Sequence, residues 1–359
     1  MSGIVGHVTY ALLAASELSG RESPLAPVVF RHLPVYLAGS YLGCDIQTLP
    51  AAICEDTGRR VGYGSSPIEK SPLTGGKVRP WRLEYRGREI SPHEIHEIFY
   101  GRSHLILGWT NAGEGDRIPL SSLVDYGASV AGDAVELFGP GDEALAYVLG
   151  WLTHVMGDGL IKSVINGINL NLLGGTYTAQ NRPVQDLVSF NEVGIGEWGL
   201  DWSVLLDQLA NTPVELVQVH YMRCGVKGGR LGAHFENGWN PGLAPLLERV
   251  LEENRSYQRV RNVELVAQLT VTDGNCDPEL GRSSGGLSYA EMKKAAEAAG
   301  FREALTQMGI LIADFFERIV EEQERLQDLP KASGSEWEEW LEIERATKGS
   351  ENAKTSPAR

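Results

Sequence analysis

The sequence predicts a mainly helical protein: a multi-helix bundle with a small β-hairpin insertion and a C-terminal extension. Apolar residues recur at helical spacing in the first 20 residues and again over 288–329. The segment 142–166 is apolar on nearly all sides, which is typical of a central buried helix. Strict alternation of apolar and charged residues, the mark of a strand, is confined to 81–85.

The first helices are expected within the first 42 residues. Apolar side chains at 8, 11, 12, 15 and 18 follow the helical repeat, and Gly20 ends it. A second apolar segment covers 30–42 and ends at Gly43. Both segments are expected to pack their apolar residues into the core.

The stretch 54–92 differs in composition and is rich in Gly, Pro, Ser and Arg. Its alternating residues 81–85 end at Arg86-Gly87, which predicts a small hairpin on an insertion. Helical character returns over 92–109, with Ser91 as the N-cap and Pro92 at the first helical position.

The central helix 142–166 begins with Asp142-Glu143, whose negative charge suits a helix N-terminus. Residues 167–200 hold many Gly and Asn and are expected to form a loop-rich crossing. The Val-rich stretches 214–222 and 260–272 fit strands or buried helix pieces, and periodicity does not choose between them. The clearest helical run is 288–329.

Three regions follow from this pattern. Residues 1–200, with the insertion 54–92, form a helical region that carries the candidate site. Residues 201–330 form a C-terminal extension that is mostly helical with possible short strands. Residues 331–359 form an acidic tail that is expected to be partly disordered because it is rich in Ser, Gly, Glu and Lys.

Charge and hydropathy exclude several function classes. The 359 residues carry a formal net charge of −15, which disfavours long nucleic acids and anionic membranes because both need a basic face. No apolar run reaches the ~20 residues that span a bilayer. The N-terminus lacks the basic segment followed by an apolar segment that marks a signal peptide. A cytoplasmic protein is therefore expected, while secretion after processing stays open.

The four cysteines are Cys44, Cys54, Cys224 and Cys276. They form no CxxC pair, and their spacing excludes a cysteine-based zinc site. Free thiols are expected, with a Cys44–Cys54 disulfide as the alternative.

The chemistry-bearing residues centre on His154 and Asp158 in the central helix. Residues at i and i+4 are neighbours on one helix face, and burial of this pair is costly unless it is neutralised or binds a cation. A core His–Asp hydrogen bond and a metal site are equally compatible with the pair alone. Other histidines and aspartates, namely His7, Asp45 and His104, also lie beside apolar helices. Nitrogen and oxygen ligands that converge in a helical bundle suit zinc or a similar divalent ion.

The stretch 144–158, which reads ALAYVLGWLTHVMGD, resembles the signature helix A-x-Y-x-L-G-x-x-x-H-x-x-x-D of the zinc-dependent phospholipase C family. His7 resembles the N-terminal His of that family, and Gly39–Ile46 resembles its G-x-x-x-P-D-I turn. His104, or alternatively His96, lies where another His ligand is expected. A Val-Asn stretch after the signature, seen in bacterial members, has its counterpart at 164–166. The resemblance covers roughly residues 1–195.

This resemblance implies an all-α fold of the phospholipase C/nuclease type and a zinc-dependent phosphodiester hydrolase. The implied metal ligands are His7, Asp45, His104, His154 and Asp158. Asp158 would bridge two ions, and Asp45 and Asp158 are the implied catalytic residues. The implied cofactor is zinc, with up to three ions, and the implied substrate is a small-molecule or lipid-like phosphoester.

The departures from the family point to fewer than three ions. The family places a further His where this chain has Val164, next to Lys162, and the His of a later H-x-x-x-E pair is absent although Glu192 is present. Asp186, His220 or His234 are possible replacements. The alternative is a catalytically inactive relative that serves as a binding or scaffold protein with a structural metal or a polar core pair. A third reading is another metal-dependent reaction that uses His93, His96 or His234.

Overall fold

A computed structural model describes residues 4–42, 49–62, 68–72, 74–95, 124, 127–128, 142–162, 180–212 and 244–327. Side chains at 41–42, 155, 158–162, 244, 247 and 323–327 lie outside this description. Within it the protein is mainly helical with small antiparallel sheets, as the sequence predicts.

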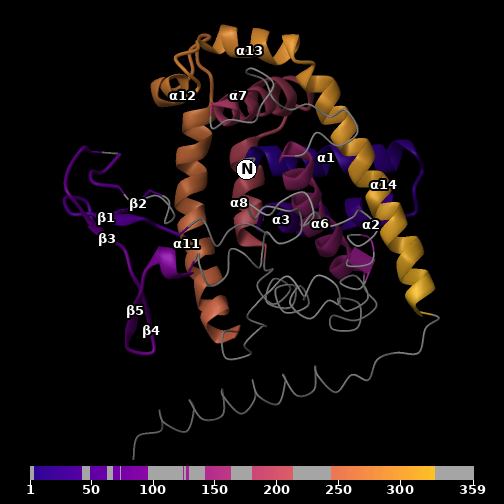
Figure 1. The fold of residues 1–359 in the computed structure, drawn as a ribbon, viewed down its shortest axis with the longest axis horizontal. Coiled ribbons are helices and arrows are strands. Elements are labelled where there is room, and N and C mark those ends of the chain that lie inside the picture. The colour runs from indigo at the N-terminus through magenta and orange to yellow at the C-terminus, as the bar shows by residue number, and fades with distance from the viewer. Residues whose placement is uncertain are drawn as a thin grey trace, which may run out of the picture.

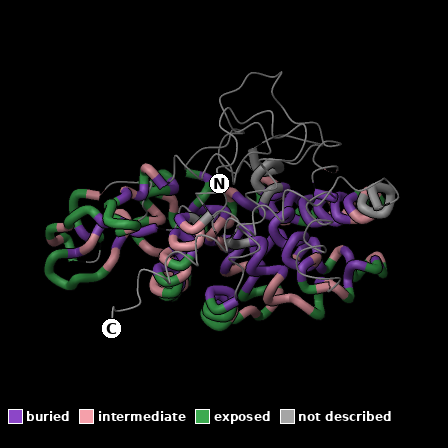
Figure 2. The backbone as a smooth tube through the Cα atoms, turned by 90° about the horizontal axis from the view of Figure 1, so that it is seen from below, coloured by how far each residue is buried: buried purple, intermediate pink, exposed green. Residues whose placement is uncertain are grey.

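The helical body consists of α-helices and, among the described residues, one π-helix, η4. The helices are α1 (Ile4–Gly20), α2 (Leu25–Arg31), α3 (Leu33–Leu42), α6 (Asp142–Lys162), α7 (Asn181–Val188), η4 (Ser189–Glu197), α8 (Trp202–Asn211), α11 (Ala244–Leu269), α12 (Pro278–Ser283), α13 (Tyr289–Ala298) and α14 (Phe301–Gln327). Helix α3 packs along α6, and α1 packs along α14 (Figure 1). The buried residues form one large cluster inside this body (Figure 2).

Helix α6 is the predicted central helix. Its residues 146–149 and Leu152 are completely buried, and Asp142 and Glu143 occupy its first turn. Asp142 pairs with Arg31 of α2, which fixes the start of α6 against the N-terminal helices. Burial on most sides explains why this sequence is apolar all round rather than amphipathic.

The insertion is confirmed as a β structure that lies beside α11, on the opposite side of the body from α14 (Figure 1). Strand β1 (Ala52–Cys54) pairs with β2 (Arg60–Val61) and β3 (Val78–Pro80), a sheet that the sequence pattern does not reveal. The predicted hairpin is β4 (Leu83–Tyr85) and β5 (Arg88–Ile90). Its turn residues Arg86 and Gly87 have φ of 51° and 74°, as a type I′ turn requires.

Several side-chain contacts hold the insertion on α11, two of which join Tyr257 and Glu253 to it. The hydroxyl of Tyr257 donates to the Gly62 carbonyl at 2.8 Å, and Arg60 bonds to Glu253 at 2.9 Å. Cys54 in β1 is a buried free thiol, in line with the prediction for the cysteines. Ser91 and Glu94 form reciprocal capping hydrogen bonds, and 92–95 are helical, so the predicted N-cap is confirmed. The rest of the predicted helix, 96–109, lies outside the described residues.

Three sequence expectations need correction or completion. The loop-rich crossing expected at 167–200 is wrong over 181–197, where α7 and η4 are helical. The Val-rich stretch from 260 is helical to Leu269 as the end of α11, while 214–222 lies outside the described residues. The run 288–329 is two helices, because the chain breaks at Gly300, whose φ is +61°.

Helix α13 begins with a capping box. The Ser288 hydroxyl accepts from the Glu291 amide and donates to the Glu291 carboxylate, which also accepts from the Ser288 amide. The Ser288 hydroxyl and amide lower the pKa of Glu291. Because the pKa of Glu291 is lower in the folded chain than in the unfolded one, the ionised carboxylate stabilises the fold. This contribution is fully present above the unfolded-state pKa of about 4.3, and it is lost as the pH falls through the folded-state pKa.

We therefore expect Ser288→Ala to lower the free energy of unfolding by about 1 kcal/mol at pH 7. Part of this difference from the natural chain should disappear in acid, where Glu291 is protonated. Urea unfolding at a series of pH values, from pH 7 down through the pKa of Glu291, measures both effects. Ser16→Ala, at an exposed position inside α1, is the control, and it should leave stability unchanged or raise it slightly because Ala is the better helix former. Equal behaviour of the two variants would contradict the capping role.

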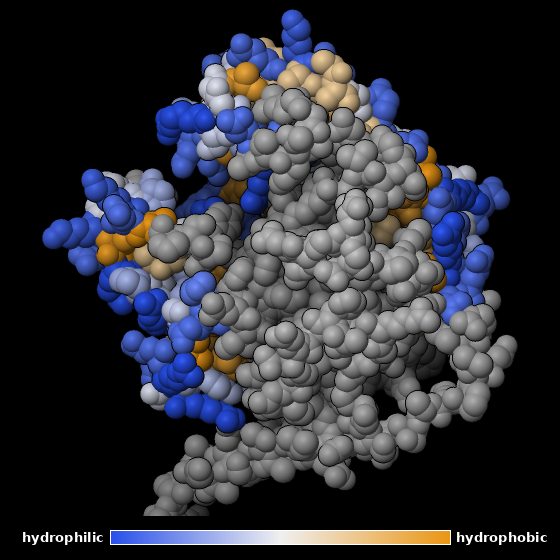
Figure 3. Space-filling model, in the orientation of Figure 1, coloured by the Kyte–Doolittle hydropathy of each residue, from blue (hydrophilic) through white to orange (hydrophobic). Residues whose placement is uncertain are grey.

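On the face shown in Figure 3, the described side chains are largely hydrophilic, with some apolar ones on the helical body and on the insertion. Among the described helices, none combines the length and the apolar character that a membrane span needs.

Candidate functional site

Helices α1, α3 and α6 meet closely because glycines replace side chains at their contacts. A Cβ on Gly150 of α6 would lie 1.9 Å from the Tyr36 carbonyl oxygen of α3. A Cβ on Gly39 of α3 would lie 2.5 Å from the Tyr147 carbonyl oxygen of α6. The two backbones therefore approach each other at a distance that only glycine allows, and α3 and α6 are held in one register.

Histidines from two of these helices come together in the core. The rings of His7 in α1 and His154 in α6 stack with their centroids 3.9 Å apart and an interplanar angle of 21°. Both side chains are buried, with 3% and 1% of their surface exposed. The sequence predicted both residues for one site, and the structure places them in direct contact although 147 positions separate them.

A backbone carbonyl fixes the tautomer of His154. The Nδ1 atom lies 3.1 Å from the Ser40 carbonyl oxygen of α3. Because a carbonyl oxygen only accepts, Nδ1 carries a proton, and in the neutral form of the ring the lone pair would then lie on Nε2. Histidine ligands of metal ions usually donate their other ring N–H to such an oxygen, which orients the ring. Sequence reasoning missed this partner, because a backbone atom leaves no residue-type signal.

Close packing also positions His7. Tyr10 meets the His7 ring edge-on, with centroids 5.9 Å apart. A Cβ on Gly157 of α6 would lie 2.7 Å from a ring carbon of Tyr10 and 3.7 Å from Nδ1 of His7. Gly157 thus lets the α1 side chains reach α6 within one turn of His154.

A buried hydroxyl pair links the same three helices. Tyr36 of α3 donates to the Ala11 carbonyl oxygen of α1 at 2.8 Å and lies 3.3 Å from the Thr153 hydroxyl of α6. Burial raises the pKa of the Tyr36 hydroxyl, so it remains a neutral donor. These bonds tie the helix that carries Ser40 to the two that carry the histidines.

The side chains of the other predicted ligands lie outside the described residues. Asp45 and His104, with the alternative His96, lie outside the described residues, as do Val164, His220 and His234. The backbone of Asp158 lies on α6 one turn after His154, but its side chain and that of Lys162 lie outside the description. Within the described part of the chain, no group of three His, Cys, Asp or Glu side chains could hold a metal ion.

Asp186, a possible replacement ligand, and Glu192, the retained Glu of the H-x-x-x-E pair, have other partners. Asp186 lies 3.6 Å from Arg182, one turn away on α7. Glu192 accepts from the Tyr289 hydroxyl at 2.7 Å and from Lys293 at 2.8 Å, both on α13. Burial alone would raise the pKa of Glu192, but these two bonds outweigh it, and the pKa lies below its ordinary value. The alternative of another metal-dependent reaction named His93, and this side chain is exposed on the helical turn 92–95.

Of the predicted ligands, the structure describes the side chains of His7 and His154. Their stacked rings would serve zinc as ligands of separate ions, because an imidazole holds a metal in its own ring plane. Neutral imidazole is a preferred zinc ligand, and His154 presents the tautomer that such a ligand needs. Both rings are buried in one place and come from the helices that the predicted ligand set requires. The number of ions depends on carboxylates and a histidine whose side chains lie outside the description.

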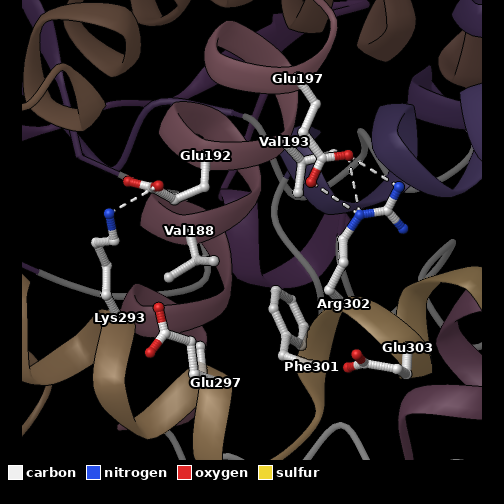
Figure 4. Close-up of a pocket in the computed structure, with 10 residues that line it drawn as sticks. Val188, Glu192, Val193, Glu197, Lys293, Glu297, Phe301, Arg302 and Glu303 are labelled. Atoms are coloured by element: carbon white, nitrogen blue, oxygen red, sulfur yellow. Dashed lines mark hydrogen bonds and ion pairs between the residues drawn. The ribbon is translucent and has the colours of Figure 1, made fainter.

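A separate cavity of about 260 Å³ lies between η4, α13 and α14, and we call it the η4 pocket (Figure 4). Its buried wall is formed by Val188, Val193, Ala296 and Phe301. Charged side chains surround this apolar wall: Glu192, Glu197, Lys293, Glu297, Arg302 and Glu303.

Comparison with known proteins gives no relative. No protein-family model, no curated protein and no solved structure matches this chain.

Proposed function

We propose that this protein is a zinc-dependent hydrolase of phosphoric esters that resembles phospholipase C. The observation that carries the proposal is the buried stack of His7 on His154, with the His154 tautomer set by the Ser40 carbonyl. His7, Asp45, His104, His154 and Asp158 would hold one to three ions, with fewer than three expected. When bound, zinc supplies Lewis acidity toward a phosphoryl oxygen and lowers the pKa of a coordinated water.

The protein's own residues have defined tasks in this proposal. His154 would offer the Nε2 lone pair of its neutral ring, and the Ser40 carbonyl orients that ring through Nδ1. Tyr36, by bonding to Ala11, keeps α3 and α1 in the register that stacks the rings. Asp45 and Asp158 would supply the anionic ligands that balance the cationic centre. With a net charge of −15 on the chain, phosphate recognition would fall to this buried centre, which favours a small or lipid-like phosphoester.

The test is metal content together with turnover. Full-length protein supplied with zinc should retain at least one ion per chain by elemental analysis and should hydrolyse bis(p-nitrophenyl) phosphate. Asp158→Asn should lower the bound zinc and reduce turnover by at least 100-fold. Asp207→Asn makes the same change at an exposed position on α8 and should alter neither quantity.

Two outcomes would contradict the hydrolase. If no zinc is retained, the histidine pair is a polar core contact. If zinc is retained without turnover, the metal is structural and the protein is a non-catalytic relative that binds or scaffolds.

A further inference from the structure

The η4 pocket depends on the π-helical geometry of η4. A π-helix closes its hydrogen bonds between residues five apart, so such residues stand one turn apart on the same face. Two pairs with this spacing line the pocket: Val188 with Val193 and Glu192 with Glu197. In an α-helix, residues five apart point about 140° away from each other. The π-helix therefore creates this wall, and π-helical turns are frequent at functional sites.

The charges around the pocket are arranged in two ways. Glu192 is held by Lys293 and Tyr289, and Glu197 is held by Arg302 through bonds of 2.9 and 3.0 Å (Figure 4). Both cations of the rim are therefore neutralised by a carboxylate at close range.

Glu297 and Glu303 have no such cation. They stand on either side of Phe301 (Figure 4), and among the described residues no ion pair involves either of them. The rim thus presents uncompensated negative charge beside an apolar wall. Carboxylates of this kind favour a positively charged donor, with which they form charge-assisted hydrogen bonds.

The size of the pocket limits the ligand. A cavity of 260 Å³ equals the liquid volume of about nine water molecules. It is smaller than the ~300–1,000 Å³ of pockets that take drug-sized ligands. A single short apolar group with one charged end fills such a space, whereas a sugar or a nucleotide would leave the apolar wall in contact with polar groups.

We infer that the η4 pocket binds a small organic amine, whose ammonium group is attracted by the rim carboxylates Glu297 and Glu303 and whose apolar body lies against Phe301, Val193 and Ala296. This inference rests on none of the residues of the proposed zinc site, so the amine site and the zinc site are tested independently.

Isothermal titration calorimetry with 2-phenylethylammonium tests the site. The matched ligands are 2-phenylethanol, which keeps the apolar body without the charge, and phenylacetate, which reverses the charge. The ammonium should bind at least tenfold more tightly than the alcohol, and the carboxylate should not bind. The double variant Glu297→Gln/Glu303→Gln changes two exposed side chains and should lose at least tenfold in affinity for the ammonium.

The control is Glu69→Gln/Glu89→Gln, which makes the same change in charge at exposed positions on the β insertion and should keep the original affinity. Equal loss in the two double variants would show attraction by the net charge alone and would overturn the site. Equal binding of amine and alcohol would also overturn it. Tighter binding of a lysine-containing tetrapeptide than of the free amine would assign the pocket to a peptide side chain instead.

Discussion

Gly150→Ala should destabilise the protein by about 3 kcal/mol, although Ala is ordinarily the better helix former by about 1 kcal/mol. The added Cβ would lie 1.9 Å from the Tyr36 carbonyl oxygen and 3.1 Å from the Ser40 amide nitrogen. Both are backbone atoms of α3, so no side-chain rotation relieves the clash. Helix α3 has to move away from α6, and buried contacts along their shared face are lost.

Guanidinium unfolding of the natural chain and the variant measures this effect. Gly20→Ala is the matched control, because Gly20 is also helical and a Cβ there meets no heavy atom within 4 Å. The control should be as stable as the natural chain or slightly more stable. If Gly150→Ala behaves like Gly20→Ala, then the close approach of α3 and α6 is wrong, and with it the placement of Ser40 beside His154.

Much of the fold follows from local patterns in the sequence. The buried helix α6 is apolar on most sides, and the hairpin β4–β5 alternates and turns at Arg86-Gly87, so period and turn chemistry agree with the tertiary structure. The sheet β2-β1-β3 was not predictable in this way. Its strands, Ala52–Cys54, Arg60–Val61 and Val78–Pro80, belong to no longer run of alternating apolar and charged residues like that at 81–85.

The sequence predicts a loop at 181–197 because Asn and Gly are poor helix formers. In the structure these residues make tertiary contacts from within helices. Asn191 in η4 donates to the Leu187 and Leu269 carbonyls and accepts from the Val271 amide, so it fastens the end of α11. Gly194 is required because a Cβ there would lie 2.5 Å from Nε1 of Trp202. Both contacts join residues from separate elements, and helix propensity contains no information about them.

The candidate site, like the fold, could be predicted from the sequence only in part. His7 and His154 were predictable because histidines on apolar helices are rare enough to be noticed, and the structure joins them. The Ser40 carbonyl, Gly39, Gly150 and Gly157 act through backbone atoms or through the absence of a side chain. The η4 pocket was missed because its residues lie on one face only in a π-helix, and sequence spacing was read with the α-helical period.

His154→Gln should weaken zinc binding by at least 100-fold, and His7→Gln should weaken it as well. Glutamine keeps a polar side chain of similar size in the core but lacks the imidazole lone pair that zinc prefers. Competition with a chromophoric chelator measures the affinity. His32→Gln is the control, since His32 lies at the end of α2 outside the predicted ligand set, and it should keep the natural affinity.

Unfolding with and without zinc separates a lost ligand from a damaged fold. A metal that binds only the folded chain stabilises it by an amount that rises with the free metal concentration. Zinc should therefore raise the unfolding midpoint of the natural chain and of His32→Gln, but not that of His154→Gln. A variant that is less stable without zinc yet gains the same increment from it would retain its metal site. In that case the stacked histidines are a core contact, and the phosphoesterase proposal loses its main support.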